Sequence, residues 1–158
     1  MGESQARSSA PAPGFLVVIS CAGRKAAAPT VASELYRGSY FTACLRAAVA
    51  IAPRDNVLIV SALHGLVGLD DGPLAPYEQR LDQPGAVTAT TIRAQAVRRG
   101  VAGFPVVALC GARYAALARQ AWPEVETPLA GLGIGQQLHI LSGLRAGRNL
   151  RVADRIAG

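Results

Sequence analysis

The sequence is poor in the residues that build metal and redox centres. It has three cysteines and two histidines, and no two cysteines form a C-x-x-C pair. A structural zinc site takes four such ligands at characteristic spacings, so this class of site is not expected. The sequence therefore predicts reduced thiols, no metal and no cofactor.

Long apolar stretches are also missing. No run reaches the roughly 18 apolar residues that span a bilayer, and the Ser/Ala/Pro/Gly-rich residues 1–14 lack the apolar segment of a signal peptide. These absences predict a cytoplasmic protein without membrane contact, in which 1–14 form a disordered tail. With 158 residues, 51% of them hydrophobic, we expect residues 15–158 to form a single, monomeric domain.

Lysine is nearly absent, because Lys25 is the single lysine among 16 basic residues. The formal net charge is still +6. A basic protein of this size attracts polyanions. The charge thus predicts nucleic acid, either DNA or RNA, or a nucleotide as a partner, although the excess could also serve solubility alone.

Short β-branched runs alternate with amphipathic segments along the chain. Apolar runs at 15–20, 57–62 and 105–110 predict strands buried on both faces. A weaker strand is expected at 125–127. Helical spacing predicts four helices: 36–49, 88–102, 112–122 and one that follows a glycine-rich turn at 131–136.

This alternation implies right-handed crossovers and a sheet covered on both faces. We predict an α/β three-layer sandwich with a four-stranded parallel sheet in the order 2-1-3-4. That order places a switch point between the first and third strands, where ligands bind outside the carboxyl ends. Four loops should meet there: 20–25, the long loop from His64, 110–114 and 131–136.

The loop "SCAGRK" after the first strand holds Lys25 at the predicted ligand edge. Here a compact ammonium suits a phosphate contact or an amine nucleophile, and we favour the phosphate contact. Cys21 in the same loop is interpreted as a small hydrophobic residue rather than a nucleophile.

The stretch "SALHGLVGLDDGPLAPYEQRL" carries most of the chemistry. His64 leaves the carboxyl end of a strand and can assist a leaving group near neutral pH. Asp70 and Asp71 precede Gly-Pro and suit a turn, whereas no turn explains Glu78. Glu78 is therefore the preferred acidic catalyst, ahead of the aspartates. The later turn "GLGIGQ" resembles an anion-binding helix N-terminus but follows the last strand, unlike the dinucleotide fingerprint.

Several motifs together resemble an uncharacterised bacterial and phage family, from residue 15 to about 145. They are C-x-x-x-K after the first strand, "LYRGSYF", "SALHGLVG", "PYEQRL" and "PLAGLGIGQQL". That family is distantly similar to the uracil-DNA glycosylase superfamily and to a domain of archaeal tRNA base-modification proteins. The resemblance implies a glycosylase-like sheet, a base-binding pocket at its carboxyl edge and hydrolysis of an N-glycosidic bond.

The chain departs from the glycosylase pattern in two places. No Asp or Asn precedes a proline after the first strand, and His139 falls inside the last helix. The acid and base roles would therefore have moved to His64, Glu78, Asp70 or Asp71.

These features predict a DNA glycosylase that removes a modified or damaged base, in repair or in defence against phage DNA. The alternatives are an N-glycosidase or transferase of free nucleosides or nucleotides, and a non-catalytic nucleic-acid-binding protein. The expected catalytic residues are His64, Glu78 and Asp71. The expected substrate-binding residues are Ser20, Cys21, Arg24, Lys25, Tyr36, Tyr40, Ser61, Tyr77, Gly111, Arg113, Gly133, Gly135 and Gln136.

Overall fold

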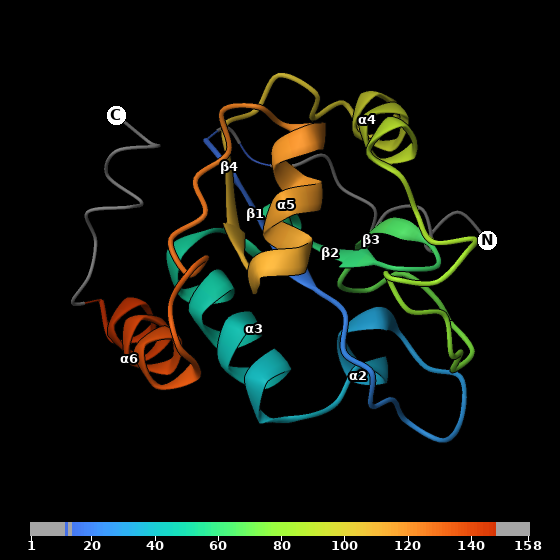
Figure 1. The fold of residues 1–158 in the computed structure, drawn as a ribbon, viewed down its shortest axis with the longest axis horizontal. Helices are drawn as coiled ribbons and strands as arrows, with labels where there is room; N and C mark the ends of the chain where they lie inside the picture. Colours follow the sequence, from blue (N-terminus) through green and yellow to red (C-terminus); the bar gives the residue numbers. More distant parts are fainter. Residues whose placement is uncertain (1–11, 13, 148–158) are drawn as a thin grey trace.

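A computed structural model describes residue 12 and residues 14–147 of the chain (Figure 1). Its elements, in chain order, are β1 (Leu16–Ser20), α2 (Ala32–Leu35), α3 (Ser39–Ile51), the 3-10 turn η1 (Arg54–Asn56), β2 (Val57–Ser61), β3 (Gly65–Gly68), α4 (Ala89–Arg98), β4 (Val106–Leu109), α5 (Ala112–Ala121) and α6 (Ile134–Arg145). Within the described residues, no helix has the length and apolar character needed to cross a bilayer.

The strands form one four-stranded mixed sheet in the order β3-β2-β1-β4. β1 pairs in parallel with β2 on one side and with β4 on the other, as the three apolar runs predicted. β3 is antiparallel to β2 and forms the edge. The predicted all-parallel sheet in the order 2-1-3-4 is therefore wrong at its fourth strand.

Two local features explain this error. The connection from β2 to β3 is only three residues long, and Gly65 has a φ of 76°, which favours a tight hairpin. β3 itself has four residues and a glycine at each end, so it lacks a clear alternating pattern. The strand expected at 125–127 is reduced to a single bridge between Glu126 and Val107, followed closely by Pro128, which cannot donate to a ladder.

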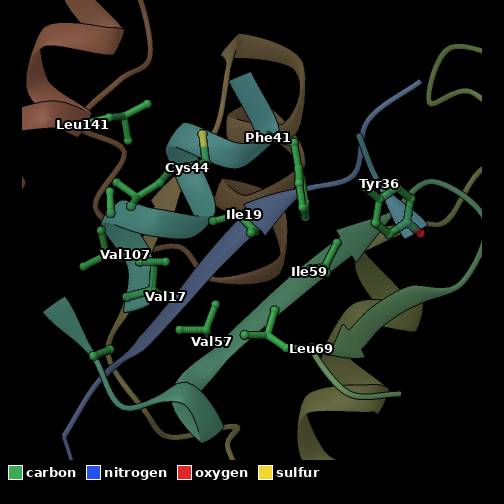
Figure 2. Close-up of a cluster of buried hydrophobic side chains, with 14 of the residues drawn as sticks. Val17, Ile19, Tyr36, Phe41, Cys44, Val57, Ile59, Leu69, Val107 and Leu141 are labelled. Atoms are coloured by element: carbon green, nitrogen blue, oxygen red, sulfur yellow. The ribbon is translucent and has the colours of Figure 1, made fainter. Parts of the chain in front are cut away.

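Alternate strand residues face two separate cores. Val17 and Ile19 pack in the core that α3 and α6 cover, and Figure 2 shows this cluster. Leu16 and Val18 pack in the other core, against α4 and α5. Because successive side chains of a strand point to opposite faces, continuous apolar runs fill both cores, which confirms the predicted α/β class with three layers.

The ends of the predicted domain fall partly outside the described residues, namely 1–11, 13 and 148–158. Ala12, which was assigned to the tail, forms two hydrogen bonds with Asn56: its N–H donates to Oδ1 at 2.7 Å, and Nδ2 donates to its carbonyl at 2.8 Å. Nδ2 also donates to the Phe15 carbonyl at 3.0 Å. The fully buried Asn56 therefore fixes the position of Ala12 and Phe15, which lead into β1.

The long loop predicted from His64 is interrupted by β3, and only its remainder, between β3 and α4, contains neither helix nor strand. It is held by backbone hydrogen bonds instead. The Ala32 N–H donates to the Asp71 carbonyl at 2.8 Å, and Thr30 and Leu74 exchange two bonds of 3.1 and 2.8 Å. These contacts lay the segment beside the loop that follows β1, and they bring Tyr77 to the carboxyl end of β2, where it bonds to Ser61.

Candidate functional site

Three hydroxyl groups meet at the carboxyl end of β2. The Oγ of Ser61 accepts hydrogen bonds from the N–H groups of Leu63 (3.1 Å) and His64 (2.9 Å). It also lies 2.6 Å from the Oη of Tyr77, which lies 2.7 Å from the Oη of Tyr36. A hydroxyl oxygen has two acceptor lone pairs. Since the two amides occupy both, the Ser61 hydroxyl donates its proton to Tyr77.

The two phenols of this cluster are held in their neutral form. Burial raises the pKa of Tyr36, although hydrogen bonds with Ser61 and Tyr77 partly oppose it. Burial also raises the pKa of Tyr77, and the nearby Cys21 adds to the effect. Tyr36 lies at the end of the aliphatic cluster, beyond Phe41 (Figure 2). Both tyrosines therefore act as hydroxyl groups, not as phenolates, over the ordinary pH range.

The ring of Tyr77 has a charged group and a histidine against it. The Nζ of Lys25 lies 4.3 Å from its centroid and 5.8 Å from that of Tyr36. The His64 ring meets the same ring edge to face, with centroids 5.3 Å apart. Lys25 is next to Tyr36 because the two residues form an antiparallel bridge. The cluster thus holds an ammonium over two aromatic faces.

A cavity with a volume of about 370 Å³ lies beside this cluster. One wall is formed by residues 21–23 and Lys25, in the loop that directly follows β1. Another is formed by Arg113 and Tyr114 in the first turn of α5, which follows β4. This is the crevice between β1 and β4, where the direction of chain progression reverses and where ligands bind in open α/β sheets. The lining residues are Cys21, Ala22, Gly23, Lys25, Glu78, Gln79, Arg80, Leu81, Asp82, Arg113 and Tyr114.

Charged groups of both signs line the cavity. Arg113 and Arg80 pair with Asp82 at 3.0 and 3.6 Å. The hydrogen bond from Arg113 is the main reason why the pKa of Asp82 is lowered. Within the described part of the chain, the Glu78 carboxylate has neither an ion pair nor a side-chain hydrogen bond. Glu78 is exposed at the rim of the chain segment that lines the cavity, so its carboxylate is accessible to a ligand as well as to solvent.

Cys21 also lines this cavity, next to another lining residue, Tyr114. Its Sγ lies 3.2 Å from the Oη of Tyr114. Burial and this cysteine raise the pKa of Tyr114, so its hydroxyl stays protonated. In the part of the chain that the structure describes, no three His, Cys, Asp or Glu side chains gather in the way that metal ligands do.

The structure separates two of the three expected catalytic residues from the cavity. His64 was expected to be catalytic together with Glu78, but it is not among the cavity-lining residues and packs on Tyr77 instead. The Asp71 carboxylate accepts hydrogen bonds from the Gly68 N–H and from Arg99, both at 2.8 Å. Asp71 therefore serves the turn after β3, which is the structural alternative for this residue.

Some of the expected binding residues line the cavity, and others lie outside it. Cys21, Lys25 and Arg113 line the cavity, whereas Tyr36, Tyr77 and Ser61 form the hydroxyl cluster behind Lys25. Three others lie along the neighbouring backbone without lining the cavity: Ser20 ends β1, Arg24 accepts a backbone bond from Arg37, and Gly111 caps α5.

The glycine-rich turn at 131–136 does not reach this cavity. Gly133 is the N-cap of α6, and Gly135 and Gln136 are exposed. Tyr40 donates to the side chain of Gln137 at 2.6 Å and so links α3 to α6. We predicted that this turn lies beside the other loops because we expected a parallel strand at 125–127 to precede it. The structure has a single bridge there, between Glu126 and Val107.

Sequence reasoning missed the residues that complete the cavity after Glu78. Gln79, Arg80, Leu81 and Asp82 simply continue the same loop, and Tyr114 lies next to the expected Arg113. The signal for 79–82 was available, since a charged segment directly follows the favoured carboxylate. Tyr114 lies on the apolar face of a predicted helix, and this position is as typical of a core residue as of a cavity residue.

A model of a family of unknown function, DUF6884, matches residues 16–143. The chain belongs to this family. Every residue that lines the cavity lies inside the DUF6884 match. Comparison with curated proteins and with solved structures gives no match. The likeness to uracil-DNA glycosylases, which the motifs suggested, therefore stays a prediction for this DUF6884 protein.

Proposed function

We propose that this DUF6884 protein hydrolyses the N-glycosidic bond of a modified or damaged base in DNA. The observation that supports it is the Glu78 carboxylate, which forms no ion pair with any of the described residues and shares a cavity with the Lys25 ammonium at the carboxyl end of β1. Cleavage of this bond develops positive charge on the sugar and requires an activated water. A carboxylate supplies both the opposite charge and the base.

The proposed reaction assigns roles to the cavity residues. The bond between the sugar C1′ and the base nitrogen breaks, and the hydroxyl of a water adds to C1′. Glu78 takes the proton of that water, and a proton returns to the departing base. Lys25 and Arg113 contact phosphates, while Cys21 and Tyr114 face the base. The target nucleotide must leave the helical stack to enter such a cavity.

A free nucleotide is the second candidate substrate. Both cavity arginines already pair with Asp82, which reduces the charge available to the phosphates that flank a target in DNA. A cavity of about 370 Å³ is also in the range of small-molecule sites, about 300–1,000 Å³. Hydrolysis of mononucleotides would fit these two features without a long binding surface.

The test is base release, measured by mass spectrometry, from DNA with normal and modified bases and from the matching mononucleotides. Glu78→Gln keeps the side-chain shape and removes the charge, so release should fall by about two orders of magnitude. Glu124→Gln, at an exposed carboxylate beyond α5, is the matched control and should keep the wild-type rate.

The outcomes separate the candidates. Release from DNA alone supports a DNA glycosylase, and release from mononucleotides supports the second candidate. DNA binding without any release would leave the non-catalytic alternative. If the Glu78→Gln protein releases base at the wild-type rate, Glu78 is not the catalytic carboxylate.

A further inference from the structure

We infer that Tyr77 is a positioning residue that holds the Lys25 ammonium at the cavity wall, where Lys25 can receive an anionic group of a ligand. The positioning itself does not depend on the reaction. Its consequence, recognition of a phosphate-bearing substrate, rests on the proposed function.

The oxygen end of the Tyr77 ring is fixed on two sides. Its Oη lies 2.6 Å from Ser61 and 2.7 Å from Tyr36. Ser61 is fully buried and ends β2, and Tyr36 is only 2% exposed. Both anchors are therefore buried, and the ring cannot move away without breaking two hydrogen bonds.

The faces and edges of this ring then determine where Lys25 lies. The Nζ of Lys25 is 4.3 Å from the Tyr77 centroid, a distance typical of a cation–π contact. The His64 ring packs against the same ring edge to face and limits its rotation. The ammonium is therefore placed by an aromatic surface whose own position is fixed at the end of β2.

This placement leaves the charge of Lys25 available. One of its N–H groups donates to the Gly23 carbonyl at 3.2 Å, and an ammonium has three donors. Within the described residues, Lys25 forms no salt bridge with a carboxylate. An aromatic ring stabilises a cation without neutralising it, so two donors and the full charge remain for an anion in the cavity.

Tyr77 also precedes Glu78 directly in the chain. The same anchor therefore limits where the Glu78 carboxylate and the Lys25 ammonium lie relative to each other, although the two residues come from loops 53 positions apart in the sequence. A substrate that needs both groups would depend on the anchor even though Tyr77 does not line the cavity.

The single lysine makes the positioning measurable. Acylation of Lys25 by an amine-reactive ester, followed by peptide mass spectrometry, reports how accessible that amine is. In Tyr77→Leu, which removes the ring, acylation should be faster by about threefold or more, the factor that corresponds to a modest cation–π contact. Tyr77→Phe keeps the ring but loses both anchors, and its rate should lie between those of wild type and Tyr77→Leu.

Tyr40→Phe is the matched control, because it removes a tyrosine hydroxyl that bonds to Gln137 instead. Its Lys25 acylation rate should equal that of the wild type. Circular dichroism establishes that each variant is folded, and if Tyr77→Leu does not fold, Tyr77→Phe decides the question. Equal acylation rates in wild type and the folded Tyr77 variants would overturn the inference.

Ligand protection tests the anionic group. Deoxyadenosine 5′-monophosphate should slow the acylation of Lys25 in the wild type, whereas deoxyadenosine should not. Equal effects of the two would overturn the assignment of Lys25 as an anion receptor. If no base is ever released but the Tyr77 variants still acylate faster, the proposed function fails and the positioning role stands. If base release is normal and depends on Glu78, but Lys25 acylation is unchanged in the Tyr77 variants, the positioning role fails and the proposed function stands.

Discussion

The three cysteines differ in burial because each lies in a different part of the fold. Cys44 lies on α3 within one core, and Cys110 directly follows β4 in the other. Burial raises the pKa of both thiols to about 12. Cys21 is only half-buried and lines the cavity. Since the thiolate is the reactive form, burial makes Cys44 and Cys110 inert and leaves Cys21 as the accessible thiol.

We therefore expect iodoacetamide near pH 8 to label Cys21 in the folded protein and to leave Cys44 and Cys110 unlabelled. Peptide mass spectrometry measures the three sites separately. In concentrated urea all three should react, which provides the control for reagent and detection. Equal labelling of Cys110 and Cys21 in the folded protein would contradict the burial argument.

At the scale of elements, one side chain of α4 completes the β2–β3 hairpin. The Oε1 of Gln95 accepts the N–H of Leu66, and its Nε2 donates to the carbonyl of His64, both at 2.8 Å. β3 is an edge strand, and such strands have backbone groups without a strand partner. Gln95 satisfies two polar groups at this edge, and its side chain occupies the space that a Cβ on Gly65 would need.

Replacing Gln95 with alanine should lower the free energy of unfolding by about 1–3 kcal/mol, because partly buried backbone groups lose their partners. Gln95→Glu should also lower it, since a carboxylate still accepts from Leu66 but its second oxygen is repelled by the His64 carbonyl. Urea denaturation measures both. The control is Gln120→Ala on the exposed surface of α5, for which we expect a change within about 0.5 kcal/mol. A similarly small change in Gln95→Ala would show that the bridge does not support the hairpin.

At the scale of the whole molecule, the two buried thiols should make the free energy of unfolding decrease at alkaline pH. The pKa of Cys44 rises from 9.0 to about 12 on folding, and that of Cys110 rises equally. Above pH 9 the unfolded chain releases these protons while the folded chain keeps them. Their contribution is therefore fully present below pH 9 and is lost as the pH rises towards 12.

The free energy of unfolding should consequently fall between pH 8 and pH 10. Each such thiol contributes up to about 1.4 kcal/mol per pH unit above its unfolded pKa. Urea denaturation at the two pH values measures the change. Cys44→Ala should reduce the pH dependence even if it lowers stability at both values. An unfolding free energy that is equal at pH 8 and pH 10 would contradict the effect of burial.

The net charge of +6 also acts on the scale of the molecule. If phosphate contacts hold DNA, the affinity should fall by roughly a decade or more between about 50 and 200 mM salt. Fluorescence anisotropy with a labelled duplex provides the measurement, and Arg113→Gln should reduce the slope. Affinity that does not change with salt would exclude phosphate contacts as the main source of binding.

Of the candidate site, the sequence predicted the crevice and some of its residues. Cys21, Lys25 and Arg113 were expected at the carboxyl ends of strands and line the cavity there, together with Glu78. The sequence predicted that His64 follows a strand, but it did not predict which residues its ring contacts. A residue next to a strand end is placed by the strand, but the direction of its side chain depends on neighbours such as Tyr77, which come from distant sequence.

The sequence by itself determined the three layers and the parallel pairing of β2, β1 and β4, because apolar runs and helical spacing report burial locally. Only the tertiary structure decided the antiparallel edge strand β3, the use of Asp71 in a turn and the hydroxyl contact between Tyr36 and Tyr77. That last contact joins residues 41 positions apart. No local pattern encodes such a pairing, since it exists only after the sheet, the bridge at Lys25 and the loop after β3 have brought both side chains to one place.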